Sequence, residues 1–106
     1  MNTIIKMTIV VTGLVGAPLA AMAEDPSAGQ TLYQEVCKNC HGPTAKGMAS
    51  YPKLVGNGVD YLVTRLQTYR AGEKVGPNSP LMIPHAAELS DEDIASLAAY
   101  ITTAFE

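Results

Sequence analysis

Residues 35–42 read EVCKNCHG, and this short stretch decides how the rest of the chain is interpreted. The sequence of 106 residues contains two cysteines and two histidines, and Cys37, Cys40 and His41 account for three of these four. On a helix, two side chains three positions apart lie about one turn from each other, and the next side chain points in another direction. Three chemistries use such a group of residues.

A redox-active Cys-x-x-Cys of the thioredoxin type belongs near a βαβ pattern, and no alternating strand pattern is present in the sequence. A zinc site would need both cysteines together with His41 and His85. Cys40 and His41 diverge along a helix, however, so one tetrahedral ion can hardly bind both. Covalent haem attachment has Cys-x-x-Cys-His as its signature. The thiols of Cys37 and Cys40 would add to two porphyrin vinyl groups and His41 would bind the iron, so we predict one covalent haem c.

The iron of such a haem has a second axial position. The later part of the sequence offers Met48, Met82 and His85. Met48 lies too soon after His41 to reach the opposite haem face, and we expect it to fill a gap beside the ring. Met82 lies in a Pro-rich segment far enough along the chain to fold back over the haem. His85 follows three residues later, and we expect it to be a partly exposed side chain leading into the last helix.

The N-terminal segment has the pattern of a signal peptide. Lys6 precedes an apolar run from Met7 to Ala17, and Ala21-Met22-Ala23 forms a small-x-small cleavage site. The run is shorter than the roughly 20 residues of a membrane-spanning helix. We therefore predict a signal peptide over residues 1–23, cleaved after Ala23, and one soluble, exported domain over residues 24–106. An uncleaved N-terminal anchor is the alternative.

The charge of the exported chain limits the kinds of partner it can bind, and its size indicates that the fold needs a cofactor or a cross-link. Loss of Lys6 leaves six Lys and Arg against ten Asp and Glu. This negative balance argues against nucleic acid or an anionic membrane surface as a partner. A chain near 80 residues rarely holds together without a disulfide, a metal or a cofactor. With one Phe and no Trp in the sequence, a haem would supply both the missing core and the covalent link.

Two helices are predicted in the first part of the domain. The first begins at Asp25 and Pro26, which suit the N-cap and the first helical position, and it runs into the cysteine motif. The second covers residues 59–71, with Gly72 as its C-terminal stop. Its apolar face is formed by Leu62, Leu66 and Tyr69.

The last helix has the clearest start. Ser90 is its predicted N-cap, and Asp93 occupies the capping-box position. An apolar stripe follows, formed by Ile94, Leu97, Ala98 and Ile101. Residues 42–58 and 72–85 are rich in Gly and Pro, so we predict long loops there. Such loops pack poorly in a small globule unless they wrap around a cofactor.

Three stretches resemble the bacterial class I c-type cytochromes. They are AGQTLYQEVCKNCHG (28–42), YPKLVGNGVDYLVTRLQTYRAGEK (51–74) and LMIPHAAELSDEDIASLAAYI (81–101). The resemblance covers essentially the whole mature sequence. This sequence is similar both to small monohaem members of the family and to one domain of its dihaem members. The resemblance implies an all-α cytochrome c fold, with three main helices and long loops around one haem c. A second haem motif and the second cysteine pair of some relatives are absent from the sequence.

The resemblance also implies roles for particular residues. Met82 matches the second axial ligand, opposite His41. Pro52 matches a proline whose carbonyl accepts the N–H of the haem-binding histidine and so fixes its orientation. The first and last helices of relatives cross through small and aromatic residues. The matching positions are Gly29 and Tyr33 on one helix, and Leu97 and Tyr100 on the other.

We expect electron transfer and not catalysis. A peroxidase or a ligand sensor would need the Met82 bond to be absent or labile. With His41 and Met82 both bound, the iron has no open site for a substrate, and this ligand pair raises the reduction potential. We expect a periplasmic carrier that cycles between Fe(III) and Fe(II), and that connects a membrane oxidoreductase complex with an oxidase, a reductase or a dehydrogenase. The alternative is an electron-accepting subunit of a periplasmic, flavin-type dehydrogenase, so the chain is a monomer or part of a hetero-complex. Four cations are expected to be solvated surface charges, and not a ring around the haem edge: Lys46, Lys53, Arg70 and Lys74.

Overall fold

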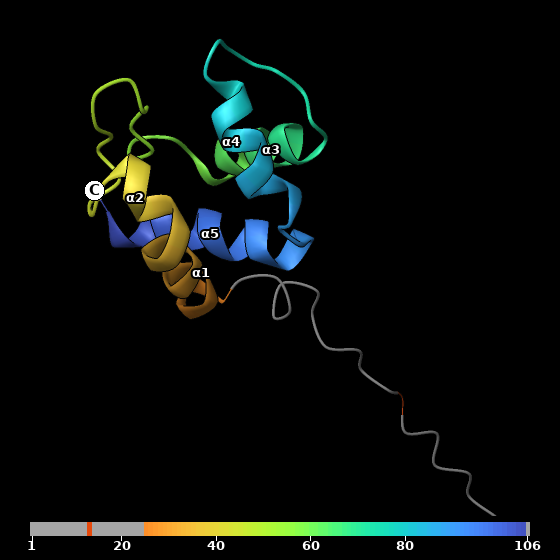
Figure 1. Cartoon of the computed structure of the whole chain (residues 1–106). Coiled ribbons are helices and arrows are strands. Elements are labelled where there is room, and N and C mark those ends of the chain that lie inside the picture. Colours follow the sequence, from red (N-terminus) through yellow and green to blue (C-terminus); the bar gives the residue numbers. More distant parts are fainter. Residues whose placement is uncertain (1–12, 14–24, 106) are drawn as a thin grey trace, which may run out of the picture.

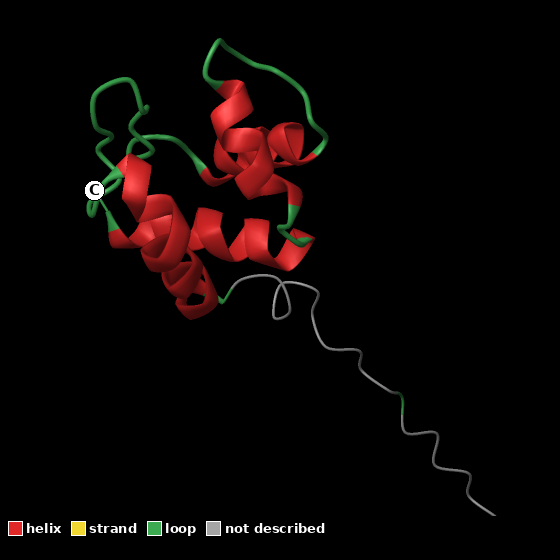
Figure 2. Ribbon diagram, in the orientation of Figure 1, coloured by secondary structure: helices red, strands yellow, loops and turns green. Residues whose placement is uncertain are grey.

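The protein is built from helices and loops, as Figures 1 and 2 show. The structure, a computed structural model, describes Gly13 and residues 25–105. The predicted signal peptide therefore lies outside the described residues, apart from Gly13. Within them, the only extended pairing is an isolated bridge between Met48 and Tyr51, which confirms the all-α class. Each helix there falls short of the length and apolarity that crossing a bilayer requires.

The first helical stretch leads directly into the cysteine motif, as predicted. It comprises α1 (Pro26–Leu32), the π-helical η2 (Tyr33–Cys37) and α2 (Lys38–His41). Asp25 caps the start, since its side chain accepts the backbone N–H of Ser27 at 3.0 Å. The stretch ends at Gly42, where φ is 90°, a conformation that glycine adopts at little cost. The π-helical segment was not predicted. It changes the rotation of the motif relative to α1.

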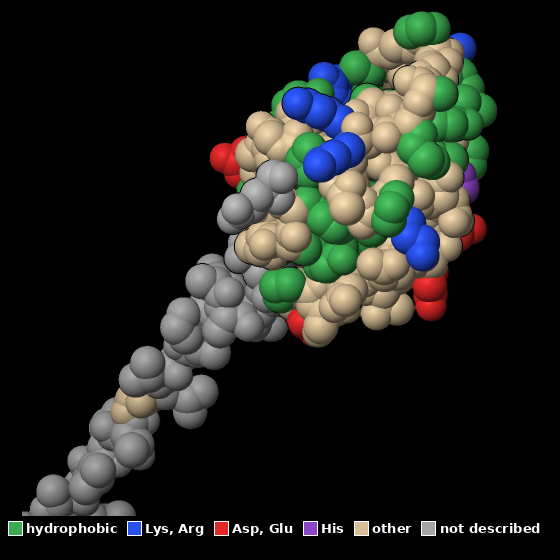
Figure 3. Space-filling model, turned by 90° about the vertical axis from the view of Figure 1, so that its left-hand side faces the viewer, with side chains coloured by type: hydrophobic (Ala, Val, Ile, Leu, Met, Phe, Trp, Pro, Cys, Tyr) green, Lys and Arg blue, Asp and Glu red, His purple; other side chains and the backbone are tan. Residues whose placement is uncertain are grey.

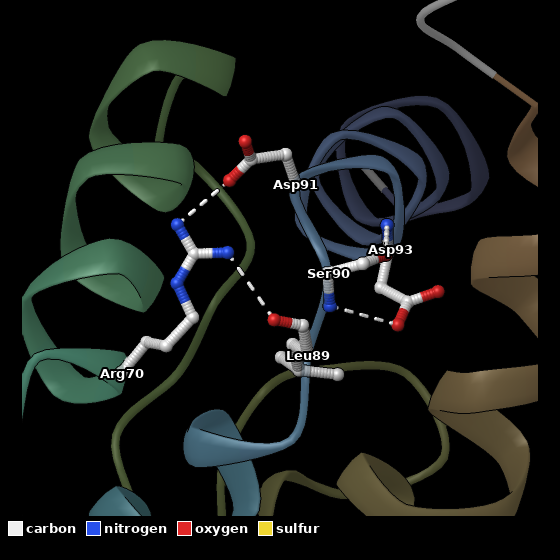
Figure 4. A network of polar contacts seen from close by, with 5 residues as sticks. All are labelled: Arg70, Leu89, Ser90, Asp91 and Asp93. Atoms are coloured by element: carbon white, nitrogen blue, oxygen red, sulfur yellow. Dashed lines mark hydrogen bonds and ion pairs between the residues drawn. The ribbon is translucent and has the colours of Figure 1, made fainter.

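The last helix, α5 (Asp91–Ala104), begins with the predicted capping box. The Ser90 hydroxyl accepts the backbone N–H of Asp93, and the Asp93 carboxylate accepts the backbone N–H of Ser90, both at 3.0 Å (Figure 4). Two backbone donors at the start of α5 are satisfied in this way. The cap fixes where the helix begins and hence which residues face the core.

The crossing of α1 and α5 forms the centre of the core, and the pairing expected from the resemblance is confirmed. Gly29 is buried against α5, where a Cβ would lie 2.0 Å from the carbonyl oxygen of Ser96. The rings of Tyr33 and Tyr100 lie 5.7 Å apart, and Phe105 packs on both. The buried cluster comprises Tyr33, Ala45, Leu62, Leu97, Ala98, Tyr100 and Ile101.

The segment before the last helix differs from the prediction. The second predicted helix is present as α3 (Val59–Arg70), but α4 (Ser79–Ala87) occupies part of the stretch expected to be a loop. Pro80 lies in the first turn of α4, where no backbone donor is needed. The buried Ser79 hydroxyl accepts the backbone N–H groups of Val75 and Gly76 at 2.8 and 2.9 Å, which organises the turn before the helix. Figure 1 shows α4 beside α3, against which it packs.

Candidate functional site

A cavity of about 470 Å³ lies between the cysteine motif, α3, α4 and α5. Its volume falls within the range of small-molecule and cofactor sites, roughly 300–1,000 Å³. Most of its lining is apolar, and these side chains come from parts of the chain that are far apart in sequence. They include Val36, Leu54, Leu62, Leu66, Val75, Leu81, Leu97 and Ile101.

His41 lines this cavity and is itself buried, with 9% of its surface exposed. Its Nδ1 lies 2.8 Å from the carbonyl oxygen of Pro52. A carbonyl oxygen can only accept, so Nδ1 carries the proton and donates this bond. In the neutral imidazole, the other ring nitrogen, Nε2, then has its lone pair available for a metal. The structure thus places Pro52 where the resemblance implied.

The loop after the motif is tied to it by backbone contacts, which bring Pro52 to His41. The backbone N–H of Gly47 donates to the carbonyl of His41 at 2.8 Å, and that of Leu54 donates to the carbonyl of Ala45 at 2.8 Å. The buried Tyr33 hydroxyl donates to the carbonyl of Gly42. The orientation of the His41 ring is therefore set by contacts with the loop and, through Tyr33, by the α1–α5 core.

Cys37 and Cys40 also line the cavity, and both are free of disulfide bonds. Burial raises the pKa of the Cys37 thiol to about 11, so in the polypeptide this group is protonated at neutral pH. Two thiols one helical turn apart, followed at once by an available imidazole, fit the vinyl groups and the iron of one haem. Among the described residues, no set of three or more His, Cys, Asp and Glu is gathered to hold a bare metal ion, so the zinc alternative has no ligand set there.

Two of the three candidates for the second axial position line the cavity. Met82 lines the same cavity as His41, although it does so from α4 and not from the predicted loop. His85, on the same helix, also lines it and is exposed as predicted, but it lies within α4 and not in a segment leading into the last helix. Met48 is 46% exposed and lies outside the lining, which argues against its expected role beside the ring.

The four predicted surface cations occupy different positions. Lys46 and Lys74 are exposed and lie away from the cavity, whereas Lys53 is exposed and lines it. Arg70 donates to the Asp91 carboxylate at 2.7 Å and to the Leu89 carbonyl at 3.2 Å. Figure 4 shows how this arginine links the end of α3 to the start of α5. It is therefore a structural contact and not a free surface charge.

Sequence analysis did not identify Arg65 and Tyr61 as part of the site. Both lie on α3 and line the cavity, with the Arg65 guanidinium 5.1 Å from the centre of the Tyr61 ring. Their four-residue spacing on a helix could have indicated the pair. Arg65 and Lys53 place two positive charges at the edge of an otherwise apolar cavity.

These residues fit a covalently attached haem. The cavity is apolar, as a porphyrin ring requires. It brings two thiols, an oriented imidazole and a thioether to one space, and two cations could pair with the propionate carboxylates of a haem. The agreement rests on the donor set of this chain, since each group expected from the motif reaches the same cavity.

Comparison with known proteins points in the same direction. The family model for cytochrome c matches residues 26–105. Cytochrome c-554(547) of Halothiobacillus neapolitanus is 39% identical over 89 residues, which cover 76% of this chain and 98% of the relative. A thiosulfate dehydrogenase electron acceptor of Stutzerimonas stutzeri is 35% identical over 95 residues, which cover 80% of this chain and 43% of the relative.

Among solved structures, reduced recombinant cytochrome c4 from Pseudomonas stutzeri superimposes with a TM-score of 0.63 at 30% sequence identity. The match covers 74% of this chain and 49% of that structure. The chain therefore spans about half the length of this longer relative, but nearly the whole length of the cytochrome c-554 relative.

Proposed function

The chain belongs to the cytochrome c family, as a class I c-type cytochrome with one covalent haem c, and we propose that it carries single electrons between redox proteins in the periplasm. One observation carries this proposal: Cys37, Cys40, His41 and Met82 line one apolar cavity. When bound, the haem supplies the one-electron Fe(III)/Fe(II) couple, and the protein supplies ligands, burial and docking.

The motif residues attach and orient the cofactor. Cys37 and Cys40 would hold the haem through their Sγ atoms, and His41 would bind the iron through Nε2. The Nδ1–H of His41 donates to the Pro52 carbonyl, 2.8 Å away. This bond holds the imidazole ring in one orientation and makes Nε2 a better donor.

Met82 would be the second residue of the chain to hold the iron in this proposal. Its thioether lines the cavity from α4, so the ligands come from two elements 41 residues apart in the sequence. Methionine with histidine raises the reduction potential of a haem. With both axial positions filled by the chain, no position is open to a substrate, so we propose a carrier and not an enzyme.

The rim of the cavity provides a surface for redox partners. Exposed apolar side chains gather there, namely Val36, Tyr61, Val75 and Leu81, with exposed fractions between 39% and 56%. On the face drawn in Figure 3, hydrophobic side chains are densest along one edge and also lie across the middle, with Lys and Arg side chains scattered among them. A small apolar rim suits the weak, transient contacts of electron-transfer proteins.

A second candidate function is that of a fixed electron-accepting subunit of a periplasmic dehydrogenase. The 35% identity to a thiosulfate dehydrogenase electron acceptor favours keeping this candidate. A carrier runs as a monomer and reacts with its partner in a salt-dependent way, because charge steers transient docking. A subunit co-purifies with its dehydrogenase, so size-exclusion chromatography of the native protein from its source separates the two functions.

Export completes the proposal. Residues 1–23 have the pattern of a signal peptide and would be removed, leaving residues 24–106 with the haem. The mass of the protein recovered from the periplasmic fraction tests this directly. A mass that still includes residues 1–23 would contradict the cleavage.

Replacement of Met82 by alanine tests the ligand assignment in the haem-bearing protein. We expect the ferric spectrum to lose its iron–methionine charge-transfer band and the reduction potential to fall, because the thioether that favours the ferrous state is gone. Met48→Ala is the matched control, since Met48 lies outside the cavity, and it should change neither property. An unchanged spectrum and potential in Met82→Ala would refute the assignment.

A further inference from the structure

His85 is the histidine for which the proposed function has no role. It follows Met82 by three residues on α4, and side chains at this spacing share one face of a helix. Both line the cavity that contains His41. Both also line an adjoining cavity of about 270 Å³, formed with residues of α5 and the first helical stretch. Two side chains of α4 that can bind iron therefore face the same space.

The imidazole of His85 is available for binding. In the part of the chain that the structure describes, the one hydrogen bond made by a histidine ring is that of His41 with Pro52. His85 is exposed and not packed in the core. Within residues 25–105, no hydrogen bond of the His85 ring needs to break before this ring can turn into the cavity.

The helix that carries both side chains packs on α3, but hydrogen bonds hold it weakly at two places. Its N-cap residue, Asn78, makes no side-chain capping bond. Pro84 lies inside α4 and cannot donate to the carbonyl of Pro80, so one helical hydrogen bond is missing. The bonds of Ser79 reach only Val75 and Gly76, which precede α4 in the chain and can move with it. A shift of about one helical turn, roughly 5.4 Å, would bring His85 to the place of Met82.

We propose that His85 is an alternative axial ligand, which binds the iron when the bond to Met82 is broken. In this exchange the iron–sulfur bond breaks and a bond from an imidazole nitrogen of His85 to iron forms. A protonated imidazole releases its proton to solvent, and no electron is transferred. The inference rests on the proposed function, in which Met82 is the ligand of the resting protein.

The exchange gives the cytochrome two ligand states. Imidazole is a harder ligand than a thioether, so it favours Fe(III), and the His85-bound state has the lower reduction potential. The iron would then stay six-coordinate after it loses methionine, and it would bind exogenous ligands poorly.

The ferric spectra of three haem-bearing variants test the proposal without any added ligand. Met82→Ala should be low-spin, with two imidazoles on the iron. Met82→Ala/His85→Ala should be high-spin. Met82→Ala/Lys53→Ala is the matched control, because the Lys53 amine also lines the cavity, and it should remain low-spin like Met82→Ala.

Titration with free imidazole gives a second readout. If His85 is bound to the iron in about nine tenths of the Met82→Ala molecules, only about one tenth have an open site at equilibrium. The double variant lacking His85 should then bind added imidazole about tenfold more tightly. Far-UV circular dichroism and mass confirm that each variant is folded and carries haem.

A high-spin Met82→Ala protein, with the imidazole affinity of the double variant, would overturn the proposal. Conversion to high spin by Lys53→Ala and not by His85→Ala would assign the ligand to Lys53 and overturn it as well. These outcomes differ from a failure of the proposed function, which would show as a missing iron–methionine band in the unmodified protein.

One further comparison avoids mutation of Met82. In mild denaturant, the unmodified ferric protein should exchange its methionine band for a low-spin spectrum with two imidazoles, whereas His85→Ala should become high-spin. Identical spectra of the two proteins across the denaturant range would overturn the proposal.

Discussion

Replacement of Gly29 by alanine tests the helix crossing that positions the cysteine motif. A Cβ at this position would lie 2.0 Å from the carbonyl oxygen of Ser96, 2.4 Å from its carbon and 2.9 Å from the nitrogen of Leu97. All three are backbone atoms of α5, so no side-chain rotation can relieve the overlap. Ordinary contact begins at 3.4 Å, and α1 must therefore move away from Ser96 by about 1.4 Å.

The expected loss of stability combines two opposing effects. Overpacking in a core costs up to about 3 kcal/mol, and the separation also loosens the contact between the Tyr33 and Tyr100 rings. Alanine recovers about 1 kcal/mol through its better helix propensity. The net loss is about 2 kcal/mol, which lowers Tm by about 8–16 °C in a domain of this size.

Thermal unfolding of the haem-bearing protein, followed by circular dichroism, measures this effect. Gln30→Ala is the matched control, because it introduces the same residue at the next position of α1, where the side chain is exposed. Its stability should stay within about 0.5 kcal/mol of the unmodified protein. Equal Tm values for Gly29→Ala and Gln30→Ala would refute the close crossing.

Two other substitutions test the polar contacts that support the fold. Tyr33→Phe removes the bond from the Tyr33 hydroxyl to the buried Gly42 carbonyl, which keeps the Ala45 N–H at 3.3 Å. The loss should be about 0.5–1.5 kcal/mol in urea unfolding at pH 7. Burial raises the pKa of Tyr33 to about 12, above the ordinary value near 10. Because the folded state favours the neutral phenol, this contribution is present below pH 10 and is lost as the pH rises from about 10 to 12. The Phe variant should lack that alkaline loss, and parallel stability profiles of the two proteins would count against this account. Ser90→Ala removes the cap of α5 and should cost about 1 kcal/mol, whereas Ser90→Gly should cost only a few tenths, since glycine is tolerated at an N-cap. Equal losses for the two, again by urea unfolding, would contradict the capping role.

The sequence predicted well where a local pattern dictates a local structure. Asp25 and Ser90 were identified as N-caps because their side chains bond to the adjacent backbone, and both do so. The cysteine motif predicted the cofactor because the spacing of its two thiols and its imidazole matches the groups of one haem. The Gly29 crossing was predicted only through the resemblance, because no local sequence pattern indicates which helix packs against Gly29.

Other features depend on contacts that single-sequence patterns do not contain. α4 was missed because Pro80 and Pro84 suggest a loop, whereas Pro80 occupies a first-turn position and packing on α3 stabilises the helix despite Pro84. The π-helical segment was missed because its residues fit an ordinary helix equally well. Arg65 was missed because only the tertiary fold brings α3 and the loop with Lys53 to the same cavity.

Ligation of one haem by His41 and Met82 is the central claim, and the visible to near-infrared absorption spectrum of the exported protein tests it most directly. Oxidised and then reduced protein should give c-type spectra, with an iron–methionine charge-transfer band in the ferric state that disappears on reduction. A c-type spectrum that lacks this band in the ferric state would contradict the closed, methionine-ligated electron carrier.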